Sequence, residues 1–413
     1  MFKYTRRRFL QASLAAAPLM ALTPTVPLFV ARVARAGAKA IPGRILVVVE
    51  LVGGNDGINT VVPYADEGYA KYRRSLRLPR DQLVRLDDQI GLHPALKPLA
   101  AVWEAGHLAI VQGVSYPNPS RSHFVSRGVW HTARRDFGRE PGIGWLGRGL
   151  DEAIDRLAPA VFVGDAVVPV ALRGRRRSCV SLGRPEDCRL LAEVPSGGPA
   201  ALVPSVGPQG DDLLAYAQRA AVDAAGAADL FARTGLAAGG PRYPATPLGR
   251  RFQVVARAIK AGLSASTYYL TQGDGDVGAG SYDTHAGQLS VHAGLLAELA
   301  EGWVSLLSDL RTSRLEERVA LMAFSEFGRR VEENASGGTD HGTAGPVLLA
   351  GGSIRGGLIG PTPRLIDLEG GDLKGAVDFR QVYATVLEHW LGVPAKVALG
   401  GSFDALPLFR VVP

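Results

Sequence analysis

Two short motifs in the C-terminal half of the sequence place an aspartate close to a histidine. The first pairs Asp283 with His285, and the second pairs Asp340 with His341; both lie among glycine, serine and threonine residues. A carboxylate together with an imidazole is a ligand pair for a divalent ion such as Zn²⁺ or Mn²⁺. The alternatives are loop hydrogen bonds or an Asp–His pair for acid–base catalysis. The two motifs therefore favour a metal site or a proton-transfer site.

Two earlier segments carry further candidate groups. Asp56 ends the run G-G-N-D, and Ser122 lies in S-R-S-H-F, where a helix is expected to begin. A serine hydroxyl at a helix start faces the positive end of the helix dipole, which suits an attacking oxygen or a bound anion. The alternatives are a turn aspartate and a helix-capping serine. Neither segment has the spacing of the dinucleotide-binding fingerprint or of the G-x-S-x-G nucleophile elbow.

A third polar segment, Ser325–Arg329 (S-E-F-G-R), directly follows an apolar run. Its charged residues are Glu326 and Arg329. Either both line the same cleft as the Asp–His motifs, or they form a buried ion pair that holds the loops together.

Strand-like and helix-like patterns alternate along the chain, which predicts an α/β fold with a mostly parallel central sheet. The apolar runs are Ile45–Leu51, Leu108–Val111, Val161–Val163, Val167–Leu172, Val319–Phe324 and Val347–Ala350. The helical patterns are His123–Thr132, Trp145–Leu157, Asp211–Arg233, Leu248–Ala261, Gln288–Arg311 and Phe379–Leu391. Ligands of such sheets bind outside the carboxyl ends of the strands, so the polar residues that follow the strands are expected to meet there.

The first 36 residues have the layout of an export signal. Thr5–Leu10 contains the adjacent arginines of the twin-arginine motif, an apolar run follows, and Ala34–Ala36 has the small-x-small pattern of a cleavage site. Three prolines break the apolar run, which disfavours a permanent anchor. We predict a signal peptide over residues 1–36 and a single domain over 37–413, with an insertion around 173–247.

This signal predicts a periplasmic or secreted protein that engages the twin-arginine translocase and keeps no stable membrane span after cleavage. The cargo of this route is folded before it crosses, often because a metal must first be loaded, so a bound metal is more strongly expected.

The charge of the chain disfavours nucleic acid as a partner. The formal net charge is +7, and residues 1–36 hold six basic residues and no acidic one, so the remainder is near +1. A nucleic-acid-binding domain needs a basic surface on its working part. One arginine cluster, Arg173 to Arg177, is either a solvated loop or an anion contact.

The chain has two cysteines, Cys179 and Cys188. They can close one small disulfide loop or remain free thiols, and their number excludes a cysteine-based zinc cluster and a four-cysteine iron–sulfur site.

Taken together, the motifs resemble the bacterial exported proteins grouped as the domain-of-unknown-function 1501 family. The matching segments are Val49–Gly57, Ser120–Phe124, Gly144–Arg148, Asp283–His285, Ser325–Arg329 and Gly338–Gly342. That family is assigned to the alkaline phosphatase superfamily, alongside sulfatases and cofactor-independent phosphoglycerate mutases. The resemblance implies an alkaline-phosphatase-like, three-layer α/β sandwich.

The resemblance also implies roles for individual residues. Asp56 after the first strand binds a metal ion, and Ser122 is the nucleophile. Asp283 and His285 bind one ion, while Asp340 and His341 help to bind the other. The implied cofactors are one or two divalent ions, zinc, manganese or calcium. The implied activity is hydrolysis of small-molecule or polymer-bound phosphate or sulfate esters.

The sequence departs from the superfamily pattern in two ways. The first Asp and His are two residues apart instead of four, and the late histidine, His389, lies in a helical pattern instead of a loop. His123, Glu326 and Arg329 are candidate catalytic residues beside Ser122, and His123 and Glu326 are also the candidate substitutes as ligands. Two alternative functions stay open: a non-catalytic secreted protein that binds cell-surface polysaccharide or a protein partner, and a transferase that moves a phosphoryl-containing group onto envelope polymers.

Overall fold

The computed structural model describes residues 43–136, 142–153, 157–164, 166–176, 179–182, 242–263, 265–273 and 280–410. The predicted signal peptide, the helical pattern Asp211–Arg233, most of the predicted insertion and Cys188 lie outside the described residues. In the part that is described, no helix combines the length and the apolar character that a membrane crossing needs.

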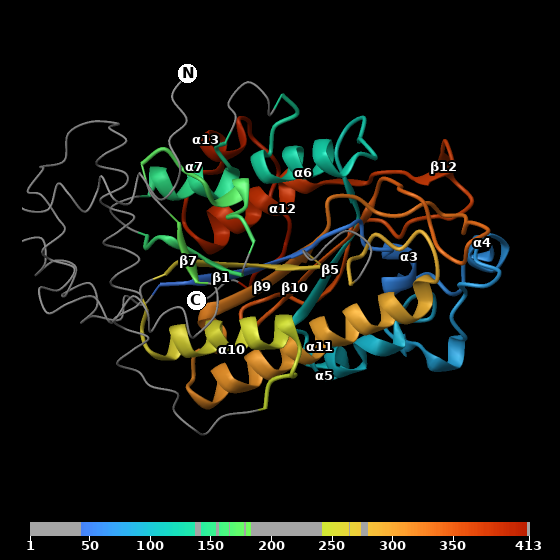
Figure 1. Cartoon of the computed structure of the whole chain (residues 1–413), viewed down its shortest axis with the longest axis horizontal. Helices are drawn as coiled ribbons and strands as arrows, with labels where there is room; N and C mark the ends of the chain where they lie inside the picture. Colours follow the sequence, from blue (N-terminus) through green and yellow to red (C-terminus); the bar gives the residue numbers. More distant parts are fainter. Residues whose placement is uncertain are drawn as a thin grey trace, which may run out of the picture.

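A nine-stranded sheet forms the centre of the structure (Figure 1). Its order is β11-β5-β10-β9-β1-β8-β6-β7, with β14 also paired to β5. All neighbours are parallel except β10, which is antiparallel to both β5 and β9. The strands are β1 (Ile45–Leu51), β5 (Leu108–Ser115), β6 (Ala160–Val163), β7 (Val180–Leu182), β8 (Thr267–Gln272), β9 (Val319–Phe324), β10 (Gly345–Ala350), β11 (Gly357–Ile359) and β14 (Val377–Asp378).

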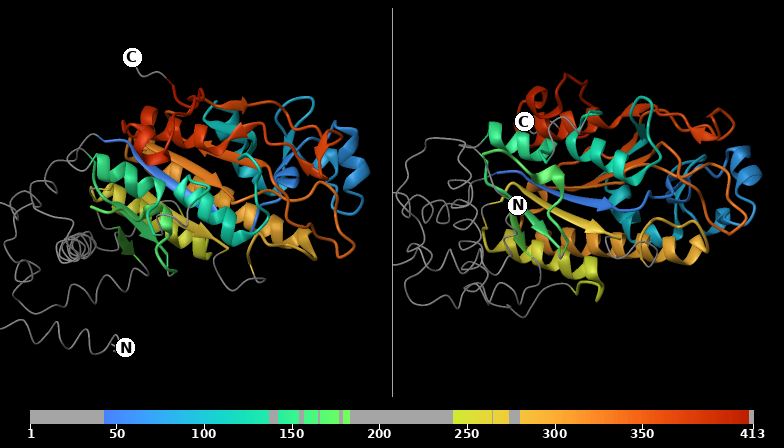
Figure 2. Two further views of the ribbon diagram at one scale, coloured as in Figure 1. Left: turned by 90° about the horizontal axis from the view of Figure 1, so that it is seen from above. Right: turned by 45° about the horizontal axis from the view of Figure 1, so that its top comes forward.

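Helices cover both faces of this sheet (Figure 1, Figure 2). Successive side chains of β1 point to opposite faces: Val47 and Val49 belong to one apolar core, and Leu46 and Val48 to the other. The first core contains α10 (Pro247–Lys260) and α11 (Gln288–Thr312). The second core contains α6 (His123–Thr132), α7 (Trp145–Glu152), α12 (Phe379–Thr385) and α13 (Ala395–Leu399). The predicted three-layer α/β sandwich with a mostly parallel sheet is therefore confirmed.

Smaller elements lie around these layers. The short helices are α3 (Gly57–Thr60), α4 (Glu67–Tyr72) and α5 (Ala100–Glu104), and the 3-10 turns are η2 (Arg80–Gln82), η3 (Pro94–Leu99), η4 (Val170–Leu172) and η6 (Glu316–Arg318). A π-helical turn, η7 (Val386–Trp390), follows α12. Two further small sheets are built from β2 (Val61–Val62), β3 (Val84–Arg85) and β4 (Gly91–Leu92), and from β12 (Leu368–Glu369) and β13 (Asp372–Leu373).

Two strand expectations differ from the structure. The run Val167–Leu172 contains no strand: its last three residues, Val170–Leu172, form the 3-10 turn η4, and Pro169 before the turn has no N–H to donate to a sheet. Conversely, β8 was not expected. Its sequence, T-Y-Y-L-T-Q, lacks a continuous apolar run, although all six residues are buried.

Candidate metal centre

Three segments that are distant in the sequence meet beyond the carboxyl ends of β1, β8 and β9. His123 is the first residue of α6, Asp283 and His285 lie between β8 and α11, and His341 precedes β10. Ligand atoms of His123, Asp283 and His341 lie within 4.8 Å of one another, so these residues form a group that can hold a metal ion. Together with His285 they are called the His/Asp cluster below.

The imidazole nitrogens of the cluster converge on one carboxylate oxygen. The Nε2 atoms of His285 and His341 each lie 3.1 Å from Oδ1 of Asp283, and Nε2 of His123 lies 3.5 Å from it. The Nε2 atoms of His285 and His341 are 2.9 Å apart. Three imidazole nitrogens thus lie around one carboxylate oxygen.

The other ring nitrogen of each histidine has an acceptor as its partner. Two partners are carboxylates and one is a backbone carbonyl, so in each neutral ring Nδ1 carries the proton and Nε2 carries the lone pair. The pairs are His123 Nδ1 with Glu326 Oε1 at 2.8 Å, His285 Nδ1 with Asp340 Oδ1 at 3.1 Å, and His341 Nδ1 with the carbonyl of Arg121 at 2.8 Å.

This arrangement fits a bound cation. With Nδ1 protonated, the three Nε2 atoms and the carboxylate oxygen are all acceptors, and a cation satisfies them together. Nε2 of His123 is buried and has no hydrogen-bond partner within the described residues. Ligand atoms around one Zn²⁺, each at about 2.0–2.2 Å, lie roughly 3–3.5 Å apart. The distances from Oδ1 of Asp283 to the three Nε2 atoms, and the distance between the Nε2 atoms of His285 and His341, are of this size. Three nitrogens and one oxygen suit zinc better than calcium.

Arg329 keeps the carboxylate of the cluster ionised. Its Nη2 donates to Oδ1 of Asp283 at 2.6 Å. Burial by itself raises the pKa of Asp283, but the hydrogen bond and the positive charge of Arg329 outweigh it, and the pKa is lowered from 3.8 to about 2. Asp283 is therefore a charged ligand at neutral pH.

Arg329 also fastens the loops that carry the site. Its buried guanidinium donates to four backbone carbonyls from three loops, and it is paired with Asp283 instead of Glu326. The acceptors are the carbonyls of Gly53, Gly54, Tyr282 and Thr339. The structure thus differs from the Glu326–Arg329 ion pair that was one alternative read from the sequence: Arg329 does hold the loops, but it is paired with Asp283 at the edge of the cluster.

Glu326 links the cluster to the loop after β1. Its buried carboxylate accepts from the backbone N–H of Gly53 at 3.0 and 3.2 Å, and from Nδ1 of His123. Glu326 therefore orients a ligand instead of contributing an atom to the group around Asp283. Asp340 has the same relation to His285: its side chain is 59% exposed, and hydrogen bonds from Asn334 and His285 lower its pKa.

The loop after β1 approaches the cluster so closely that it tolerates only glycine. Gly53 has a φ of +112°, and a Cβ at this position would lie 2.5 Å from the backbone nitrogen of Asp283. We expect Gly53→Ala to lower the melting temperature and to weaken zinc binding, measured by thermal unfolding and by chelator competition. Gly357→Ala is the matched control, because Gly357 has a φ of +132° but a Cβ there would meet no atom within 4 Å. Equal zinc affinity in the two variants would contradict this expectation.

Asp56 lies outside the His/Asp cluster. It is fully buried and caps α3, and its Oδ2 accepts from Nη1 of Arg73 and from Nε2 of Gln288, both at 2.5 Å. Burial raises the pKa of Asp56, but the charge and hydrogen bonds of Arg73 lower it from 3.8 to about 2. The positive charge next to Asp56 therefore comes from the guanidinium of Arg73.

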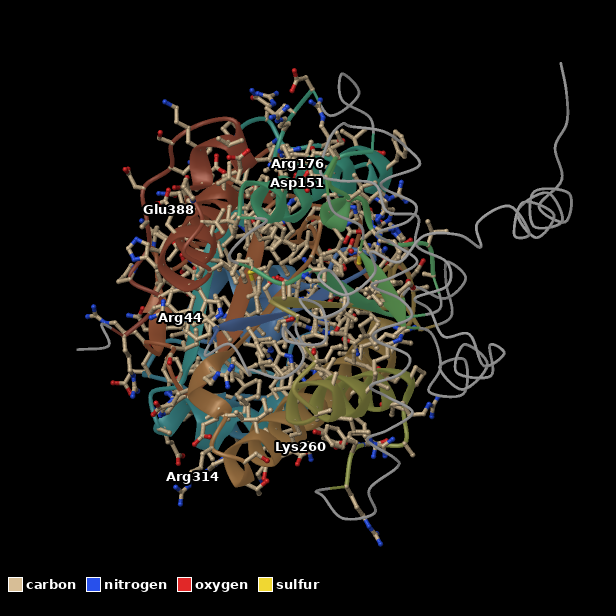
Figure 3. All side chains as sticks on the ribbon, turned by 90° about the vertical axis from the view of Figure 1, so that its left-hand side faces the viewer. Arg44, Asp151, Arg176, Lys260, Arg314 and Glu388 are labelled. Carbon is tan, nitrogen blue, oxygen red and sulfur yellow. The ribbon has the colours of Figure 1, made fainter. Side chains whose placement is uncertain are left out.

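Ser122 occupies the N-cap position of α6, directly before His123. It is exposed and its side chain makes no capping hydrogen bond. His389 lies on η7, at the opposite end of β1: the Nη1 of Arg44, the residue before β1, donates to its carbonyl oxygen at 2.5 Å. Figure 3 labels Arg44 and Glu388, the residue before His389. The late histidine is therefore far from the cluster along β1.

The sequence gives no sign of the role of Arg73, which lies in the segment K-Y-R-R. For His123 and Glu326 it predicts a catalytic role first and a ligand role second. One feature of the sequence points to His123 as a ligand: it follows a serine at the start of a helix, beyond the end of a strand, where ligands of such sheets bind.

The sequence matches no curated protein. It does match one protein family, and the structure is similar to several solved structures. Phosphonate monoester hydrolase from Silicibacter pomeroyi is 12% identical, with 87% of this chain and 77% of that chain covered and a TM-score of 0.34. The lipoteichoic acid synthase LtaP from Listeria monocytogenes is 9% identical, with 78% and 71% covered and a TM-score of 0.35. Alkaline phosphatase from the Antarctic bacterium TAB5 is 10% identical, with 77% and 95% covered and a TM-score of 0.28.

The family comparison bears on the motifs. Residues 216–400, which include both Asp–His motifs, match the family described as "Protein of unknown function (DUF1501)". The resemblance noted from the motifs is thereby confirmed over these residues.

Proposed function

We propose that this chain is an exported, divalent-metal-dependent hydrolase of phosphate or sulfate esters. The observation that supports the proposal is the convergence of three lone-pair-bearing Nε2 atoms on Oδ1 of Asp283. A cation held by nitrogen and oxygen ligands at a partly open site is the usual centre of metal-assisted ester hydrolysis.

The residues have separate tasks in this proposal. His123, His285, His341 and Asp283 hold the ion, which supplies Lewis acidity toward a phosphoryl or sulfuryl oxygen. Glu326 and Asp340 fix the ring orientation of two ligands. The proposal uses one ion, because the carboxylate of Asp56 is already neutralised by Arg73.

Ser122 is the proposed nucleophile. Its hydroxyl is exposed and lies one residue before a ligand of the ion. The first-turn amides of α6, a helix of ten residues, favour a negatively charged oxygen of the substrate at the same place.

The test uses the full chain and two generic substrates, p-nitrophenyl phosphate and p-nitrophenyl sulfate. Metal-loaded protein is expected to hydrolyse at least one of them, and Ser122→Ala to reduce turnover by roughly 10² or more with metal content unchanged. Ser120→Ala is the control, because Ser120 is the neighbouring serine and its Oγ accepts from the backbone N–H of Ser122. Activity that survives Ser122→Ala would exclude the serine mechanism. A protein that binds metal but turns over neither ester would favour the binding role.

The export part of the proposal rests on the twin-arginine motif. Replacing Arg6 and Arg7 with lysine is expected to retain the protein in the cytoplasm, as measured by cell fractionation and immunoblotting. Unchanged export of this double variant would argue for another route.

A further inference from the structure

We propose that a buried carboxylate in β1, Glu50, positions the metal ligand His123 by anchoring helix α6. The inference rests on the proposed metal site, and it adds residues that hold a ligand in place without touching the ion. The supporting observations are the contacts of Glu50, the spacing of its partners along α6 and their relation to His123.

Glu50 is fully buried, and its partners come from two elements. Nε of Arg127 donates to Oε1 at 2.8 Å, and Nε2 of His131 lies 3.0 Å from both carboxylate oxygens. The hydroxyl of Tyr269 on β8 donates to Oε2 at 2.8 Å. Three side chains thus surround a carboxylate that lies between the sheet and α6.

The two helical partners lie at regular intervals from the metal ligand. His123, Arg127 and His131 are four residues apart in succession, so they share one face of α6. The first contacts Glu326 after β9, and the other two contact Glu50 on β1. Since β1 and β9 are paired, with Glu50 opposite Phe324, one face of the helix is attached to two adjacent strands over two turns.

Apolar contacts hold the end of α6 in place more firmly than its first turn. Trp130, near the end of α6, stacks on Phe324 and Phe379 with centroid distances of 5.1 and 4.4 Å. At the other end, Phe124 is 78% exposed. The first turn is held by the ring contact of His123 with Phe327, at a centroid distance of 4.8 Å, and by polar contacts. Among these, the contacts to Glu326 and Glu50 attach the helix face that carries His123 to the sheet.

The decisive experiment compares Glu50→Gln with Asp309→Asn in the full chain. Asp309 is a buried carboxylate that accepts from Lys260 Nζ at 2.7 Å and from the hydroxyl of Tyr243 at 3.0 Å, so it matches Glu50 in kind but joins α10 and α11 instead. We expect Glu50→Gln to weaken zinc binding about 10–100-fold, the range found when groups that orient a metal ligand are removed. Asp309→Asn is expected to change zinc affinity by no more than about twofold, whatever it costs in stability.

A second measurement needs no metal. Hydrogen exchange of the amides of α6 in the metal-free protein is expected to accelerate in Glu50→Gln and to stay unchanged in Asp309→Asn. If Glu50→Gln does not fold, Tyr269→Phe, which removes a single hydrogen bond, is expected to give the same two effects at smaller size.

The outcomes separate the inference from the proposed function. A wild-type protein that binds no zinc overturns the proposed function, yet faster α6 exchange in Glu50→Gln still supports the anchoring of α6. Wild-type zinc affinity in Glu50→Gln, or unchanged exchange in α6, overturns the inference even if the protein is an active hydrolase.

Discussion

His341→Ala protein is expected to be isolated without zinc under conditions in which the wild type retains about one equivalent. His341 contributes one of three nitrogens that converge on Asp283, and its ring also lies 2.9 Å from Nε2 of His285. Structural zinc sites bind with about 10–16 kcal/mol from four ligands, so loss of one ligand weakens binding on the order of 10²–10³-fold. Plasma mass spectrometry of dialysed protein and competition with a chromogenic chelator measure the two quantities.

Two further variants make this prediction specific. His389→Ala removes an exposed histidine at the opposite end of β1 and is expected to leave zinc content unchanged. Asp340→Ala removes a group that orients His285 and is expected to weaken binding by only about 10–100-fold. If Asp340→Ala and His341→Ala lost zinc equally, Asp340 would be a direct ligand, as the superfamily pattern implies.

Asp56→Asn is expected to destabilise the protein by about 3–5 kcal/mol while the zinc content stays the same. The side chains of Asp56 and Arg73 are both fully buried and 2.5 Å apart, and removal of one partner leaves the other charge buried without its counter-ion. Urea unfolding measures the loss. Asp340→Asn is the control, because this carboxylate is 59% exposed and its loss is expected to cost less than about 1 kcal/mol.

The same pair predicts a pH dependence. The pKa of Asp56 is lowered from 3.8 to about 2 in the folded protein, so its stabilising contribution is complete above about pH 4. It is lost progressively as the pH falls from about 4 to about 2. Unfolding of Asp56→Asn is expected to lack this part of the acid sensitivity. If this variant instead kept its stability and lost its zinc, Asp56 would act as a ligand and not as the counter-ion of Arg73.

The sequence predicted the sheet more fully than it predicted the site. Apolar runs located β1, β9 and the interior of β5, because a strand buried on both faces has few polar residues. The strand β8, whose end leads to Asp283, was missed because most of its residues are threonine, tyrosine or glutamine, which do not form an apolar run, although all six are buried. Two of them are buried with hydrogen-bond partners: Tyr269 donates to Glu50, and Gln272 donates to Glu298 and to the carbonyl of Leu295.

For the site, the motifs identified the residues that meet but not the atoms that face one another. Asp283, His285 and His341 came from the two Asp–His motifs, and the structure brings them together. The different role of Asp56 depends on Arg73, a residue in no motif whose guanidinium reaches the carboxylate only in the folded chain. No spacing rule along the sequence reports such a contact, so the assignment of Asp56 as a ligand stays a prediction that the zinc measurement tests.

The central position of β1 has a consequence for biosynthesis. This strand is among the first described segments to leave the ribosome, yet its partners β8 and β9 follow more than 200 residues later. Until then its seven buried residues have no neighbours in the sheet, and pairing of strands so far apart is slow. The nascent chain therefore carries an unpaired, strongly apolar strand for most of its synthesis, and a holding chaperone is expected to bind at Ile45–Leu51 until the C-terminal half is complete.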